Sequence, residues 1–141
     1  MLSTDLQKLI NVFLAGEMLS WKQMVPHLNW ALDEINSELN TEFPLFENDT
    51  VTYEAFPDKY VRTVIVPGAV YHFYQVDEEG LTQATQFKED FYRGLYAMQR
   101  DYSHLIPEEY QSDVLNGTVD SVYQDEDGLR GVTGLTFDSW G

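Results

Sequence analysis

The histidines and the acidic pairs are the residues of this chain whose chemistry could serve a reaction or a metal ion. The three histidines, His27, His72 and His104, are far apart in the sequence, and none belongs to an HExxH or similar ligand spacing. The carboxylate pairs Asp33–Glu34 and Glu89–Asp90 fit solvated helix faces better than acid/base catalysis. His72 is flanked by aromatic residues, which favours a hydrogen-bonded interior or interface histidine. We therefore expect no catalytic residue and no metal ligand among these groups.

The other motifs also argue against an enzyme or a cofactor. The run Asp125 to Gly128 resembles half of an EF-hand calcium loop, but that register places Tyr123 at the first ligand position and Gly134 at the last. The chain has no cysteine, which excludes disulfides, thiolate metal sites and cysteine nucleophiles. It also contains no glycine-rich phosphate loop and no nucleophile elbow.

The charge of the chain limits its partners. Twenty-four acids against eight Lys and Arg give a formal net charge of −16. Such a surface repels phosphate backbones and anionic lipids, which argues against a nucleic-acid or membrane binder. An aromatic content of 14% is too high for a disordered acidic chain. Two interpretations stay open, namely aromatic surfaces that bind protein partners and an ordinary soluble domain. No apolar run approaches the ~20 residues of a membrane span, and the N-terminus lacks the basic start of a signal peptide, so we expect a soluble intracellular protein.

The stretch from Pro57 to Tyr102 organises the predicted fold. We expect two long helices, Pro57 to about Asp77 and Thr82 to Tyr102, folded back on each other at the acidic turn 77–80. Thr82 is predicted to be the N-cap of the second helix, and Gly80 precedes it as a helix stop. The second helix carries an apolar stripe at spacings of three and four, which predicts a buried face: Ala84, Phe87, Phe91, Leu95, Met98 and Tyr102.

The first helix of this pair has a competing interpretation as a β-hairpin. Residues 60–66 are rich in β-branched side chains, and Pro67-Gly68 could form a turn between two strands. However, an L-Pro-Gly pair favours type I or II turns, whose twist opposes that of a two-residue hairpin. Pro57 suits the first position of a helix, and Asp58 complements the helix dipole. We therefore predict a helix that is kinked at Pro67.

Two shorter helices are predicted before this pair. Thr4 to Gln7 forms a capping-box pattern that opens a helix ending before Gly16, and Ser20 to Gln23 forms a second one. Pro26 suggests that the first turn of the second helix is separate and that its main part begins near Val25. The expected apolar positions of the two helices are Leu6, Leu9, Ile10 and Phe13, and Val25, Leu28, Leu32, Ile35 and Leu39.

The connections and the C-terminal part are predicted to be extended. Residues 43–46 read as an apolar linker, residues 50–54 as a short extended segment, and residues 106–110 as one helical turn with Pro107 at its first position. From residue 112 the chain is rich in glycine and acids, and Asn116-Gly117 favours a type I′ hairpin. An isolated hairpin is marginal in water, so this arm either orders against another molecule or folds back on its own bundle.

The predicted fold class is therefore mainly α. It is a small antiparallel helical bundle of about four helices over residues 1–111, with a short extended segment near 50–54 and an extended or β-hairpin C-terminal arm over residues 112–141.

This pattern resembles the small head–tail adaptor (connector) proteins of tailed bacteriophages. The resemblance covers about Leu2 to Tyr102 and does not include the C-terminal arm. It rests on the opening helix and on the following segments of the sequence: Ser20-Trp21-x-x-Met24, Ala31-Leu32-Asp33-Glu34-Ile35-Asn36, Phe43-Pro44-Leu45-Phe46, Phe56-Pro57-Asp58-Lys59-Tyr60-Val61, Val66-Pro67-Gly68-Ala69 and Met98-Gln99-Arg100-Asp101-Tyr102.

The resemblance implies a structural virion protein made in the host cytoplasm. Its subunits, commonly twelve, would form a ring beneath the portal protein, extend the DNA channel and dock a stopper or tail-completion protein. An acidic lumen would let DNA pass without specific binding. By this analogy, contacts with neighbouring subunits or the portal fall on Tyr123, Leu129, Arg130, Phe137 and Trp140 of the arm and on Arg93 and Arg100. For the two arginines, an ordinary solvated face with local acidic partners is an equally good interpretation.

Two other functions stay open at this point. A DNA-mimic inhibitor would use dense acids to occupy the basic groove of a nuclease or repressor, but it needs neither the glycine-rich arm nor so many apolar residues. An acid/base enzyme is the third alternative, and it would depend on His72 or on the carboxylate pairs.

Overall fold

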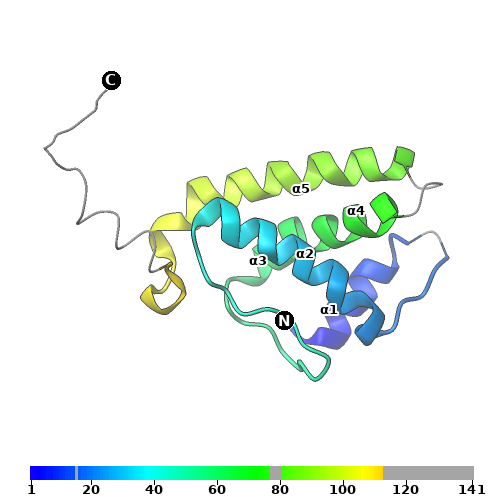
Figure 1. Ribbon diagram of the computed structural model, residues 1–141, viewed down its shortest axis with the longest axis horizontal. Coiled ribbons are helices and arrows are strands. Elements are labelled where there is room, and N and C mark those ends of the chain that lie inside the picture. Colours follow the sequence, from blue (N-terminus) through cyan, green and yellow to red (C-terminus); the bar gives the residue numbers. More distant parts are fainter. Residues whose placement is uncertain (15, 77–80, 113–141) are drawn as a thin grey trace, which may run out of the picture. The chain divides into compact units, whose positions relative to one another are not determined.

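The computed structural model describes residues 1–14, 16–76 and 81–112. This part of the chain is mainly α-helical, and four helices pack as a bundle (Figure 1). Its elements are α1 (Ser3–Asn11), α2 (Trp21–Leu39), the continuous run of α3 (Asp58–Tyr60), η1 (Val61–Ile65) and α4 (Val66–Val76), and α5 (Leu81–Tyr102). The predicted bundle of about four helices is confirmed. None of the described helices is long and apolar enough to cross a membrane.

The chain divides into two compact units, and within each unit the residues contact mainly one another. The first comprises Met1–Leu39 and Phe43–Ile106, and it contains the bundle and the one-turn helix η3 (Ser103–Leu105). The second begins with Asn40–Glu42 and resumes at Pro107. In it an isolated antiparallel bridge joins Thr41 to Gln111, and the one-turn helix η4 (Glu108–Tyr110) follows Pro107. The predicted turn is confirmed, although Pro107 is the N-cap and not the first helical residue. The predicted hairpin arm lies outside the described residues from position 113 onward.

The run from Asp58 to Val76 is helical, so the helix interpretation is confirmed and the hairpin is wrong. The irregularity precedes Pro67, because η1 is a π-helical turn in which the Val66 N–H bonds to the carbonyl of Val61. Pro67 has no N–H to donate to the carbonyl of Thr63, and its ring crowds that oxygen. A wider turn before the proline accommodates both effects.

Helices α4 and α5 lie side by side and run in opposite directions (Figure 1). The predicted stripe of α5 is buried at every position except Phe87, which is half-buried. Thr82 is not the N-cap as predicted, because α5 already begins at Leu81. The predicted acidic turn at 77–80 lies outside the described residues.

Gly68 allows three helices to meet closely. A Cβ atom added at Gly68 would lie 2.7 Å from the Phe91 ring of α5 and 2.8 Å from the Cβ of Ala31 on α2. Phe91 itself is fully buried. The bundle core is therefore centred where α2, α4 and α5 approach one another.

The two predicted capping boxes have different outcomes. At α2 the Gln23 N–H donates to Ser20 Oγ at 3.2 Å and the Ser20 N–H donates to Gln23 Oε1 at 3.0 Å, which confirms the second box. At α1 the box is wrong, because the helix begins at Ser3 and Gln7 Nε2 instead donates to the Leu19 carbonyl at 2.9 Å. Pro26 lies inside a continuous α2, so the predicted separate first turn is also wrong. Because Pro26 and Lys22 are exposed, water can solvate the carbonyl that the proline leaves without a helical partner.

Asparagines on α2 bind the linker that follows it. Asn29 accepts from the Phe46 N–H at 2.8 Å and donates to the Phe46 carbonyl at 3.0 Å. Asn36, two turns later, makes the same pair of bonds to Phe43 at 2.9 and 3.1 Å. The linker backbone is thus satisfied by side chains of α2, and both phenylalanines are buried.

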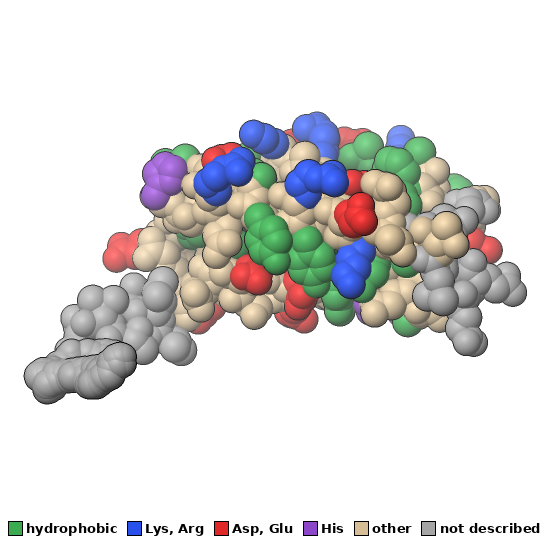
Figure 2. Space-filling model, turned by 90° about the horizontal axis from the view of Figure 1, so that it is seen from above, with side chains coloured by type: hydrophobic (Ala, Val, Ile, Leu, Met, Phe, Trp, Pro, Cys, Tyr) green, Lys and Arg blue, Asp and Glu red, His purple; other side chains and the backbone are tan. Residues whose placement is uncertain are grey.

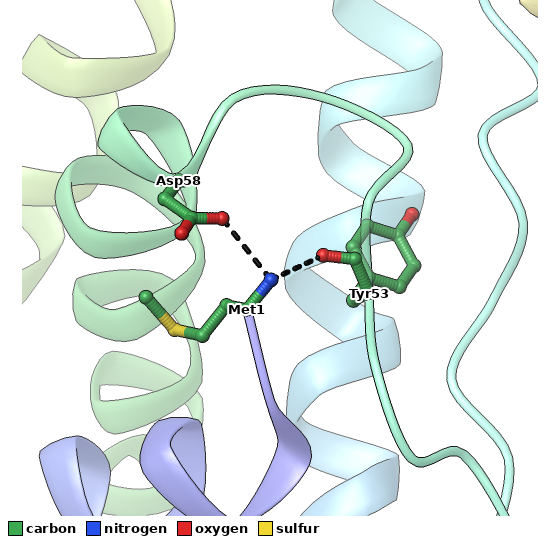
Figure 3. Close-up of polar contacts among 3 residues, drawn as sticks. All are labelled: Met1, Tyr53 and Asp58. Atoms are coloured by element: carbon green, nitrogen blue, oxygen red, sulfur yellow. Dashed lines mark hydrogen bonds and ion pairs between the residues drawn. The ribbon is translucent and has the colours of Figure 1, made fainter.

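The segment near 50–54 pairs with the start of the chain. An isolated antiparallel bridge joins Thr52 to Leu2, and the Tyr53 N–H donates to the Met1 carbonyl at 2.8 Å. The Met1 amino group donates to the Tyr53 carbonyl at 2.8 Å and lies 3.1 Å from the Asp58 carboxylate (Figure 3). These contacts tie α1 to the beginning of α3.

Candidate interaction surface

A groove lies along α5 where it faces η1 and the start of α4. We call it the α5 groove. The residues that line it are Phe13, Lys59, Tyr60, Arg62, Thr63, Val66, Pro67, Phe87, Asp90, Arg93, Gly94, Ala97 and Asp101. Its volume is about 470 Å³. Two small residues on one side of α5, Gly94 and Ala97, leave this space open because they carry little or no side chain.

The floor of the groove is made by a close helix contact. A Cβ atom added at Gly94 would collide with the carbonyl oxygen of Thr63 and would lie 3.3 Å from Val64 Cγ2. This is the carbonyl that receives no hydrogen bond from Pro67. The π-helical turn therefore places the Thr63 carbonyl against the one α5 residue that has no side chain.

One end of the groove exposes aromatic surface. Phe13, which follows α1, is 43% exposed and packs edge-on against Phe87 with a centroid distance of 5.6 Å. Phe87 is half-buried. We predicted both residues to be core positions, and their rings instead form a partly open apolar wall.

Basic side chains border this apolar surface. Lys59, Arg62 and Arg93 line the α5 groove, and Arg62 also lines an adjoining hollow together with Lys8. Figure 2 shows a face of the molecule on which Lys and Arg side chains gather around hydrophobic ones. Of these cations, Arg93 binds Asp90 at 3.0 Å, whereas the structure gives Arg62 no ion pair within the described residues. Arg62 is exposed and available to a partner.

The acids of the described residues lie mostly elsewhere. Four of the seven described Lys and Arg residues line the two hollows, together with only four of the fifteen described acids, Asp5, Asp58, Asp90 and Asp101. A fifth cation, Arg100, binds Asp101 at 2.9 Å. The remaining described residues carry two lysines and eleven acids. The groove is therefore the part of the described surface best suited to an acidic partner.

Of the predicted contact residues, Arg93 lines the groove and Arg100 lies at its border. Arg100 is 73% exposed, and its hydrogen bond to Asp101 raises the pKa of the guanidinium and lowers the pKa of the Asp101 carboxyl. Both arginines have the local acidic partners that the alternative interpretation expected. The other five predicted residues, Tyr123, Leu129, Arg130, Phe137 and Trp140, lie outside the described part of the chain.

The fold brings together two histidines that no sequence pattern pairs. His27 on α2 and His72 on α4 are 45 residues apart in the chain, yet their Nδ1 atoms lie 2.9 Å apart. His72 also stacks on Trp30 with a centroid distance of 5.1 Å and an interplanar angle of 13°. The expectation that His72 is hydrogen-bonded is confirmed, but no spacing in the sequence indicates its partner.

The histidine pair fits a packing role better than a metal site. Burial lowers the pKa of both rings, and the neighbouring His72 lowers the pKa of His27 further. One ring must donate its N–H to the lone pair of the other, so at least one of them is neutral. Within residues 1–14, 16–76 and 81–112 no group of three or more His, Asp or Glu could hold a metal ion.

The acidic pairs also have ordinary surroundings. Glu34 accepts a hydrogen bond from the Tyr92 hydroxyl at 3.1 Å, and desolvation together with this carboxylate raises the pKa of Tyr92 to about 12. Asp33 and Glu89 are exposed. Asp90 lines the α5 groove and binds Arg93. The α5 groove is the strongest candidate for a functional surface in the described chain.

Comparison of the chain with family models, with curated proteins and with solved structures finds no match.

Proposed function

We propose that this protein is a head–tail adaptor of a tailed bacteriophage. Its subunits would form a ring beneath the portal protein, extend the DNA channel and dock the stopper or tail-completion protein. The protein would then be a structural component of the virion neck, made in the host cytoplasm. The resemblance of residues 2–102 to this family suggests the role, and the four-helix bundle is compatible with it.

The observation that carries the proposal is the separation of charge over the surface. A ring requires each subunit to present two different surfaces, one of which binds the other on the next subunit. The α5 groove and the adjoining hollow together hold apolar residues and four of the seven described cations, whereas the other described residues carry three cations and eleven acids. Two surfaces of opposite charge on one subunit favour head-to-tail association. The remaining acidic surface could line a channel through which DNA slides without binding.

The same separation counts against a DNA-mimic inhibitor. A mimic must repeat the charge of a phosphate backbone over a continuous surface, and cations or exposed aromatic rings within that surface weaken it. Lys59, Arg62 and the partly exposed Phe13 form a cationic and apolar surface for which a mimic has no use.

In this proposal the C-terminal arm supplies further contacts. Residues 112–141 would form an extended or hairpin arm that orders against a neighbouring subunit or the portal, with Tyr123, Leu129, Arg130, Phe137 and Trp140 as contact residues. An arm that orders on assembly gains its structure from the partner's surface.

Quantitative mass spectrometry of purified particles of the virus that encodes this chain tests the proposal. We expect the chain to be present in copies close in number to those of the portal protein, because adaptor and portal rings are stacked. If it is plentiful in infected cells but missing from mature particles, the adaptor proposal is refuted and the inhibitor becomes the better hypothesis.

A further inference from the structure

The α5 groove needs a partner that offers both acidic and aromatic groups. Its apolar wall includes Phe13 and Phe87, and Phe13 is 43% exposed. Arg62 has no ion pair with any residue that the structure describes. Exposed aromatic surface beside such a cation is typical of a protein interface, because aromatic anchors fill the apolar part while acids approach the cations.

The chain itself contains a segment with this chemistry. Residues 113–141 carry six acids and a single cation, Arg130. Near its end the sequence reads Phe137-Asp138-Ser139-Trp140, so that two aromatic side chains flank one carboxylate. These groups complement the apolar wall and the cations of the groove, whereas most of the other described surface is acidic and would repel a carboxylate.

The segment is also long enough to reach another molecule. Twenty-nine residues follow Ser112. At about 3.3 Å per residue an extended chain of this length spans up to about 95 Å, which exceeds the size of a domain of this length. Two copies of a chain with a net charge of −16 repel each other. A contact between the acidic segment and the most cationic surface offsets this repulsion.

We propose that the α5 groove of one subunit binds the C-terminal segment of a neighbouring subunit. Phe137 and Trp140 contact the apolar wall, and Asp138 pairs with Arg62. The groove and the segment are different surfaces, so the contact is heterologous and repeats from subunit to subunit until the ring closes. The inference rests on the proposed function because it assigns the surfaces that join subunits of the adaptor ring.

Photocrosslinking within the full-length chain tests the contact. A photoreactive benzoylphenylalanine replaces Phe137, and the ¹⁵N-labelled chain is mixed in equal amounts with the unlabelled chain before irradiation. We expect mass spectrometry to find crosslinks from position 137 to peptides containing Phe87, Arg93 or Ala97, in pairs that join a labelled and an unlabelled chain. If both peptides of every crosslinked pair carry the same isotope, the segment binds its own subunit. Absence of crosslinks to the groove would also overturn the proposal.

Charge reversal gives the matched variants. Arg62→Glu should reduce the mixed crosslinks about tenfold, the factor that corresponds to about 1.4 kcal/mol of binding free energy. Asp138→Lys in the same chain should restore them. Lys22→Glu makes the same charge change at an exposed residue of α2 outside the groove and should leave the yield unchanged. Loss with Lys22→Glu, or no loss with Arg62→Glu, would refute the assigned contact.

The outcomes for the contact and for the function can be told apart. The crosslinks are measured on the purified chain and the adaptor role on virus particles. If the chain forms mixed crosslinks but is missing from the particles, the proposed contact between subunits is supported and the adaptor function is refuted. If the chain is present in the particles but forms no crosslinks to the groove, the adaptor function is supported and the proposed contact is refuted.

Discussion

Replacing Gly94 by alanine tests the close contact beneath the α5 groove. An added Cβ at this position would collide with the carbonyl oxygen of Thr63 and press on Val64. That carbonyl belongs to the π-helical turn before Pro67, so it cannot withdraw without changing the helix that carries it. We expect Gly94→Ala to destabilise the bundle.

The size of the effect follows from two opposing terms. Alanine is more favourable than glycine inside a helix by about 1 kcal/mol. Forcing an extra methyl group into a packed site costs about 1–3 kcal/mol, and a collision with backbone lies at the upper end of that range. The expected net loss is therefore about 2 kcal/mol, which lowers the Tm of a domain of this size by about 6–10 °C.

Urea unfolding followed by tryptophan fluorescence measures this loss. The matched control compares Lys88→Ala with Lys88→Gly, because Lys88 is an exposed residue of the same helix. There the alanine variant should be the more stable by about 1 kcal/mol, so the sign of the glycine-to-alanine effect should reverse between the two positions. If Gly94→Ala is as stable as the original protein or more so, then the contact with Thr63 does not constrain this packing and our reasoning is wrong.

Two further predictions concern local hydrogen bonds in α2 and between α2 and α4. Ser20→Ala should lower the free energy of unfolding by about 1 kcal/mol, because it removes the acceptor for the Gln23 N–H, and a threonine at position 20 should restore most of the loss in the same urea assay. The pKa values of His27 and His72 are below the usual 6.5, so the unfolded chain binds more protons than the folded one, and stability should fall as pH drops below about 6.5 toward the folded-state pKa values. His72→Phe retains a ring that can stack on Trp30 but cannot titrate, so its stability should depend less on pH between 7.5 and 5.5; an unchanged dependence would mean that the pair does not sense pH.

Local patterns predicted the helices well where each helix has one apolar face. The stripe of α5 repeats at helical spacing, and its members are buried or half-buried. The capping box of α2 is a contact between residues three apart, so the sequence contains all of its information. The helix around Pro67 was predictable because turn geometry argued against the hairpin, although the π-helical turn that accommodates the proline was not.

Contacts between distant segments could not be predicted in this way. Gln7 has the right spacing for a capping box, but it binds the Leu19 carbonyl, which only the folded chain brings near. The pairing of His27 with His72 likewise depends on how α2 and α4 pack. Asn29 and Asn36 are two turns apart on one helix face, yet nothing in their spacing reveals that they bind the linker.

The α5 groove belongs to this second class, since its shape depends on residues that hydrophobic periodicity treats as unimportant. Gly94 and Ala97 lie beside the predicted stripe and add little to any apolar pattern. They matter because α5 must approach a turn widened by Pro67, and a small residue is needed where the Thr63 carbonyl meets the helix. The same small residues leave the open space of the α5 groove beside the contact, and Arg62, on the widened turn, lines this groove.

The close approach of α5 to the turn before Pro67 thus produces both the tight contact and an apolar hollow bordered by cations. A substitution at Gly94 should therefore disturb binding in the groove together with the stability of the bundle, whereas Arg62→Glu should affect binding alone.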